Sequence, residues 1–83
     1  FNISRENRFA GGKLSVRTFV DKGRITDIGF YGDFFAAADP DILAQALIGC
    51  EYEQQAVRRC LVTAQAQNYF YNITLDDILS CIL

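Results

Sequence analysis

The chain has 83 residues, 51% of them apolar, and 8 basic against 10 acidic side chains give a formal net charge of −2. This length fits one domain with a single core, residues 1–83, and the mixed charge and apolar content argue against intrinsic disorder. A nucleic-acid-binding module is usually basic, and neither a signal peptide nor an apolar run of roughly 20 residues is present. We therefore expect a cytoplasmic domain with neither nucleic acid nor a membrane as a partner.

The first half of the chain predicts strands. Residues 1–9 place apolar side chains in phase between polar ones, which is typical of an edge strand, and Gly11-Gly12 closes a hairpin. Over residues 13–20 the side chains alternate, which predicts Arg17 on the face opposite the core or on the rim of the helix layer. The predicted core-facing positions of this second strand are Leu14, Val16, Thr18 and Val20. A period of two over this length predicts a half-buried strand.

A third strand is predicted to return over residues 25–31, after a tight turn at 21–24 that contains a glycine able to take a positive φ. The side chain of Ile25 is out of phase with the apolar positions that follow it. A bulge near Thr26-Asp27 would restore the alternation.

The second half of the chain changes to the period of amphipathic helices. Asp39-Pro40 is a cap followed by proline at the first helical position, Gly49 is a stop signal, and Thr74 caps a third helix. Residues 69–71 form an aromatic cluster expected to pack the helices on the sheet. The predicted core-facing positions are Ile42, Leu43, Ala46 and Leu47, then Ala56, Val57, Cys60, Leu61 and Ala64, and finally Ile78, Leu79 and Ile82.

This order of elements predicts the fold class. Strands come first and helices follow without alternation, which is typical of an α+β domain. We expect a three-stranded antiparallel sheet with about three helices packed on one face.

The reactive side chains are few. Histidine is absent, which removes the usual base for Ser-His or Cys-His chemistry, and we predict no catalytic residue. Cys50, Cys60 and Cys81 lack the close C-x-x-C pairing of zinc or redox motifs. We expect buried free thiols and no metal site.

The most distinctive stretch is Gly32-Asp33-Phe34-Phe35, which is expected to form a loop after the last strand. Two adjacent rings cannot both point inward by strand alternation, so at least one needs an unusual backbone or an apolar partner. Asp33 either accepts hydrogen bonds within its own turn or joins the two rings in a docking edge. Each ring buried in such an edge would contribute on the order of 1.5–3 kcal/mol.

Several short motifs occur in an order that points to a known family. They are Arg8-Phe9, Gly12-Lys13, Lys22-Gly23-Arg24-Ile25, Tyr31-Gly32-Asp33-Phe34-Phe35, Leu47-Ile48-Gly49 and Tyr52. In this order they resemble the C-terminal accessory domain of bacterial lipoate-protein ligases of the A type, over nearly the whole chain. The resemblance also implies the fold of the iron-sulfur scaffold proteins.

The resemblance implies a function. Such ligases activate lipoate with ATP and Mg to lipoyl-AMP and then pass the lipoyl group to a lysine of an acceptor protein. Their catalytic and nucleotide-binding residues lie in an N-terminal domain, so this domain alone is expected to be inactive and to bind no cofactor. Its expected role is that of a lid, which contacts the catalytic N-terminal domain directly and the acceptor proteins indirectly. The expected contact residues are Arg8, Gly32, Asp33, Phe34 and Phe35.

Two alternatives from other functional classes stay open at this stage. One is a free-standing iron-sulfur or sulfur-carrier scaffold module, and the other is a protein-protein adaptor, because small α+β domains host many functions. The chain begins at Phe1 and contains no methionine, so we expect a piece of a longer polypeptide. Whether that piece is a fragment or a separate subunit is left open.

Overall fold

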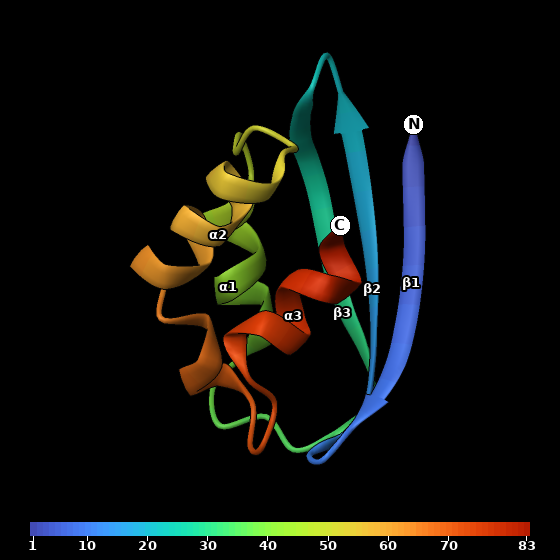
Figure 1. Cartoon of the computed structure of the whole chain (residues 1–83), viewed down its shortest axis with the longest axis vertical. Helices are drawn as coiled ribbons and strands as arrows, with labels where there is room; N and C mark the ends of the chain where they lie inside the picture. The colour runs from blue at the N-terminus through green and yellow to red at the C-terminus, as the bar shows by residue number, and fades with distance from the viewer.

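A computed structural model describes all 83 residues and places a sheet on one side of the molecule with the helices on the other (Figure 1). The elements, in chain order, are β1 (Asn2–Phe9), β2 (Gly12–Asp21), β3 (Arg24–Phe34), α1 (Pro40–Leu47), α2 (Gln54–Thr63), the short 3-10 helix η1 (Ala66–Tyr69) and α3 (Leu75–Ile82). The strands are antiparallel in the order β1-β2-β3. The predicted α+β fold class is confirmed.

The central strand β2 alternates as its sequence predicts. Its inward side chains Leu14, Val16, Thr18 and Val20 are all buried. Arg17 lies on the outer face, with its guanidinium 5.4 Å from the centre of the Tyr31 ring. The sheet therefore has one face covered by helices and one face open to solvent.

The predicted bulge is present at the start of β3. Phe19 of β2 pairs with Asp27, whereas its neighbour Val20 pairs with Ile25, so Thr26 is the extra residue. Because of this insertion both Ile25 and Ile28 point into the core, at 1% and 4% exposure. The preceding turn takes positive φ at Lys22 (52°) and Gly23 (76°), which suits a two-residue hairpin.

Strand β3 is longer than predicted, and this corrects the expected loop at Gly32–Phe35. The strand continues through Phe34, where Gly32 pairs with Leu14 and Asp33 with Lys13. Gly32 has φ +133°, and a Cβ on it would lie 2.2 Å from the Lys13 carbonyl oxygen. Glycine lets the two backbones approach closely here, so the strand continues where the sequence pattern indicates a turn.

The three main helices begin and end largely where expected. Asp39 caps α1 by accepting a hydrogen bond from the Asp41 N–H, and Thr74 forms a capping box with Asp77 in α3. The predicted inward face of α1 is wrong in part. Its buried residues are Leu43, Ala44 and Leu47, whereas the predicted Ile42 and Ala46 are exposed. Ala44 is only 5% exposed, and it joins the core on the helix that packs against β3.

The helices form the second layer. α1 packs on β3, α3 packs on β1 and β2, and α2 packs on the other two helices and on η1. Phe70, which follows η1, contributes the inward ring of the aromatic cluster and lies 5.7 Å from the Phe30 ring. The three cysteines are free, with Cys50 and Cys81 buried and Cys60 half-buried. No helix is long and apolar enough to cross a membrane.

Candidate interdomain contact surface

The predicted contact residues gather at one end of the sheet, beside the turn that joins β1 to β2 (lower end of Figure 1). Arg8 of β1 pairs with Lys13 of β2, and Lys13 pairs with Asp33 of β3. Since Leu14 points into the core, these three side chains emerge on the outer face. The register thus places Arg8 and Asp33, 25 positions apart in sequence, in one row across the sheet.

The two adjacent phenylalanines separate in space. Phe34 is half-buried, and its ring lies edge-on to Phe70 with the ring centres 4.9 Å apart. Phe35 is 77% exposed. Strand alternation therefore gives one ring to the core and the other to solvent, so only Phe35 is available to a partner.

The exposed ring of Phe35 stands on a fixed backbone. The Tyr71 N–H donates a hydrogen bond to the Phe35 carbonyl oxygen at 3.1 Å, and the Ala37 N–H donates one to the Tyr69 carbonyl oxygen at 2.8 Å. Tyr71 is itself 60% exposed. Two residues whose large rings are more than half exposed are therefore joined through their backbones.

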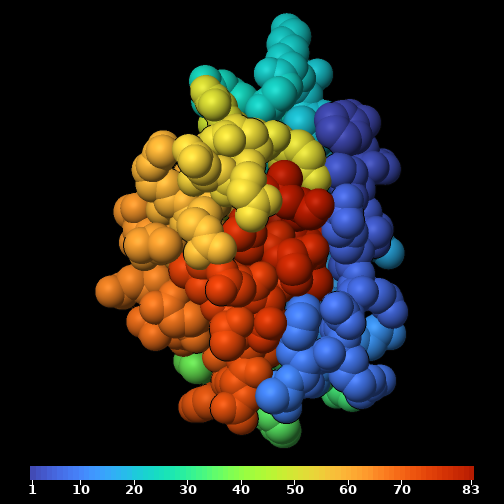
Figure 2. Space-filling view, in the orientation of Figure 1, coloured from blue at the N-terminus to red at the C-terminus, as the bar shows by residue number.

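We call this end of the molecule the hairpin-end surface. It comprises Arg8, Lys13, Asp33, Phe35 and Tyr71. Figure 2 shows the blue hairpin, some green atoms and the orange-red atoms that follow η1 together at the lower end.

The charges of the hairpin-end surface are mostly unpaired within the chain. Lys13 forms an ion pair with Glu6 at 3.2 Å, but the Arg8 guanidinium and the Asp33 carboxylate take part in no ion pair or side-chain hydrogen bond. The Asp33 side chain therefore does not accept hydrogen bonds within its own turn, which is one of its two predicted roles. One free cation and one free anion remain available to a partner.

A hollow of about 550 Å³ adjoins this surface. It lies between the β1–β2 turn and the segment after η1, and a Cβ on Gly11 would lie 1.9 Å from the Tyr71 carbonyl oxygen. The lining residues are Ala10, Gln67, Phe70, Asn72, Ile73, Thr74 and Leu75. The turn and this segment are thus in direct backbone contact, which makes the hollow part of the same rigid end.

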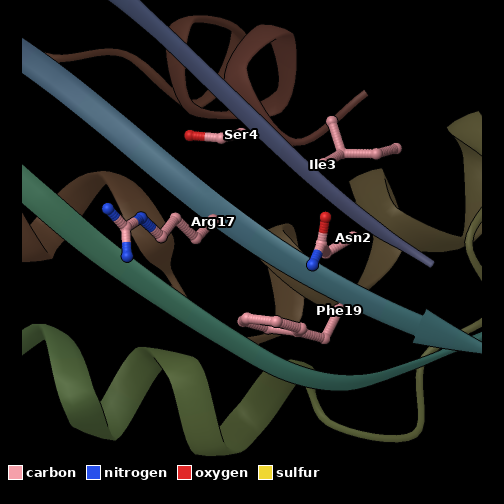
Figure 3. Close-up of a pocket in the computed structure, with 5 residues that line it drawn as sticks. All are labelled: Asn2, Ile3, Ser4, Arg17 and Phe19. Atoms are coloured by element: carbon pink, nitrogen blue, oxygen red, sulfur yellow. The ribbon is translucent and has the colours of Figure 1, made fainter.

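A second hollow, of about 290 Å³, lies along β1 and β2 and is lined by Asn2, Ile3, Ser4, Arg17 and Phe19 (Figure 3). Its only charged side chain is Arg17, which already lies over the Tyr31 ring. A Cβ on Gly29 would be 2.5 Å from the Tyr31 hydroxyl, so the tyrosine ring lies over Gly29 on the same face. This hollow offers fewer free polar groups than the hairpin-end surface.

Comparison with known proteins places this geometry in a family. The profile of the family described as bacterial lipoate protein ligase C-terminus matches residues 1–82. The chain belongs to this family. The predicted resemblance is confirmed at the level of the domain.

The relatives of this ligase C-terminal domain are about four times as long as the chain itself. Lipoate-protein ligase LplJ of Bacillus subtilis is 33% identical over 82 residues, which span 99% of this chain and 25% of the relative. A probable lipoate-protein ligase A of Mycoplasma pneumoniae is 32% identical over 84 residues, or 99% and 25% of the two chains. The chain therefore corresponds to about a quarter of such a ligase.

A solved structure shares the fold of this ligase C-terminal domain. A chain from a bi-partite lipoate protein ligase of Thermoplasma acidophilum, described with its E2 lipoyl domain, superposes with a TM-score of 0.84 at 20% identity. The match covers 100% of this chain and 96% of the archaeal chain. The layered arrangement of three strands and their helices is thus found in a solved ligase structure.

Sequence reasoning missed part of the surface of this ligase C-terminal domain. Tyr71 belongs to the aromatic cluster that is predicted to pack the helices on the sheet, yet only Phe70 of that cluster is buried. In the structure two isolated backbone hydrogen bonds join residues 35–37 to residues 69–71, which lie 34 positions further along the chain. No local pattern in the sequence indicates such a distant pairing. The only sequence signal for an exposed Tyr71 is the order Tyr-Phe-Tyr, in which two rings with a hydroxyl flank one without.

Proposed function

We propose that this chain is the accessory domain of a lipoate-protein ligase and that it meets the catalytic part of that ligase through the hairpin-end surface. In this role it closes over the catalytic site while lipoate and ATP, with Mg, form lipoyl-AMP, and it withdraws before the lipoyl group passes to a lysine of an acceptor protein. The domain supplies no reacting group of its own. ATP, Mg and lipoate belong to the catalytic part.

The observation that carries this proposal is the exposure of Phe35, at 77%, on a backbone held by hydrogen bonds to the segment after η1. A large apolar side chain on a rigid support loses little conformational entropy when a partner covers it. The membership of the chain in the ligase C-terminal family supports a catalytic ligase part as the partner. The archaeal ligase of the same fold is described as bi-partite, which supports a separable accessory unit.

The two free charges give the contact its direction. Arg8 on β1 and Asp33 on β3 flank Lys13, which lies on the central strand β2. Neither Arg8 nor Asp33 has an ionic partner within the chain. Charged groups at the rim of an interface set its orientation and its on-rate more than its affinity. We therefore assign most of the binding free energy to the Phe35 ring and the orientation to Arg8 and Asp33.

The test separates the two half-reactions of the full ligase. Adenylate formation is followed as lipoate-dependent release of pyrophosphate, and transfer is followed with supplied lipoyl-AMP and an acceptor domain. Because a buried phenylalanine ring is worth about 1.5–3 kcal/mol, Phe35→Ala should slow adenylate formation roughly 10- to 100-fold. Transfer from supplied lipoyl-AMP should change much less, since the domain is withdrawn in that step.

The matched control is Ile42→Ala. Ile42 is also an exposed apolar residue, at 59%, but it lies on α1 and outside the hairpin-end surface. This variant should keep both half-reactions. Equal loss in both variants, or unchanged adenylate formation in Phe35→Ala combined with Asp33→Ala, would show that the hairpin-end surface is not the contact.

A further inference from the structure

Two cysteines from different elements meet on the side of the molecule away from the open sheet face. Cys50 is a buried residue in the connection after α1, and Cys60 is a half-buried residue in the middle of α2. The Cys60 thiol donates a hydrogen bond to the Cys50 sulfur with the two Sγ atoms 2.8 Å apart. The separation of about 2.05 Å in a disulfide is therefore within a small side-chain movement.

The backbone holds both thiols in place. The Ile25 N–H donates to the Cys50 carbonyl oxygen at 2.9 Å, and the Gly49 N–H donates to the Ile25 carbonyl oxygen at 2.7 Å. These bonds attach the connection after α1 to the start of β3. Cys60 is held within α2, whose neighbouring residues Val57 and Leu61 are fully buried. The encounter of the two sulfurs is thus a property of the fold.

The third cysteine has different surroundings. The Cys81 thiol lies in α3 and is buried at 2% exposure, with its sulfur 3.9 Å from the Leu14 carbonyl oxygen. It has no hydrogen bond to another thiol. Cys81 therefore serves as an internal comparison for the reactivity of an isolated buried thiol.

We propose that Cys50 and Cys60 form a dithiol site that low-molecular-weight disulfides convert to an intramolecular disulfide. The Cys60 thiolate attacks one sulfur of the small disulfide, forms a mixed disulfide and releases the first small thiolate. Cys50 then loses its proton and attacks the Cys60 sulfur, which releases the second small thiolate. Two electrons pass from the protein to the small disulfide, and the two protons of the cysteines protonate the two released thiolates.

The surroundings of the two thiols set this order of events. Burial, together with the nearby carboxylates of Glu51 and Glu53, raises the pKa of the Cys50 thiol from 9.0 to about 12. The thiolate is the attacking species, so Cys50 is a poor first nucleophile. Cys60 is more exposed and receives the incoming disulfide, and Cys50 resolves the mixed disulfide that results.

The site is tested by treating the folded chain with oxidised glutathione, alkylating the remaining thiols and mapping the peptides by mass spectrometry. Trypsin separates Cys50 from Cys60 at Arg58 and Arg59, and cleavage before Asp76 separates Cys60 from Cys81. We expect a single linked pair, Cys50 with Cys60, while Cys81 stays alkylated. The same linked pair is expected in Cys81→Ala.

Two further samples test the order of the two steps and the dependence of the pairing on the fold. Cys50→Ser should stop at a mixed disulfide between Cys60 and glutathione, because the resolving thiol is gone. The wild-type chain oxidised in denaturant should give a mixture of pairings that includes Cys81. If the folded chain gives that same mixture, or keeps three free thiols under conditions that oxidise the denatured chain, the dithiol site is refuted.

Discussion

The separation of Phe34 from Phe35 can be measured as a difference in stability between two alanine variants. Truncation of a fully buried phenylalanine costs about 3–5 kcal/mol, and an edge-on aromatic pair adds about 0.5–1.5 kcal/mol. Phe34 is half-buried and lies edge-on to Phe70, so we expect Phe34→Ala to lower the free energy of unfolding by about 2–3 kcal/mol. Phe35 is 77% exposed, so Phe35→Ala should change the free energy of unfolding by less than about 0.5 kcal/mol.

Urea unfolding followed by circular dichroism measures both variants. With a slope of about 1 kcal/mol/M for a small domain, the midpoint of Phe34→Ala should fall by about 2–3 M, while that of Phe35→Ala should stay near the wild-type value. The two variants remove the same atoms at neighbouring positions, so each is the control for the other. Equal midpoints, or a larger loss in Phe35→Ala, would refute the assignment of Phe34 to the core and Phe35 to the surface.

Three other changes test the fold in the same urea assay. Gly32→Ala should lower the free energy of unfolding by more than about 2 kcal/mol, because the new Cβ would lie 2.2 Å from a backbone oxygen. Gly23→Ala, whose Cβ would point into open space, should lower it by only about 1 kcal/mol. Equal losses in the two variants would contradict the close approach of β2 and β3. Thr18→Val should leave the free energy of unfolding unchanged or raise it by up to about 1 kcal/mol, because the buried Thr18 hydroxyl has no hydrogen-bond partner. A clear loss of stability would show that this hydroxyl does make a hydrogen bond. Burial raises the pKa of the Cys50 thiol to about 12 and raises the pKa of Tyr52 above 10.0, so the folded state keeps protons that the unfolded chain releases. The free energy of unfolding should therefore be level up to about pH 9 and fall as the pH rises toward 12, and a rise over that range would contradict the burial of these groups.

The sequence predicts much of the fold because the dominant signals are local. The alternation from Leu14 to Val20 and the phase error at Ile25 are sufficient to place β2 and the bulge in β3. The predicted buried face of α1 is partly wrong because two overlapping sets of apolar positions, one with Ile42 and one with Ala44, share Leu43 and Leu47. Only the contact with β3 decides between Ile42 and Ala44.

The surface is less predictable than the fold because it depends on pairing between distant segments. The sequence identifies Asp33 and the two rings as unusual, but a glycine followed by an acid indicates a turn as readily as a strand. The continued pairing of Gly32 with Leu14 decides which ring faces outward, and it depends on the backbone of another strand. The row formed by Arg8, Lys13 and Asp33 follows from the same register and has no local signal.

The most direct test of the proposed contact is the affinity of this chain for the catalytic part of the ligase with lipoate and an unreactive ATP analogue bound, which is the state before the adenylate forms. We expect the Kd of Phe35→Ala to be roughly 10- to 100-fold higher than that of the wild-type chain, from the burial of one ring, and the Kd of Ile42→Ala to be unchanged. A wild-type Kd for Phe35→Ala, together with weaker binding by Ile42→Ala, would place the contact on the helical layer and contradict the hairpin-end surface.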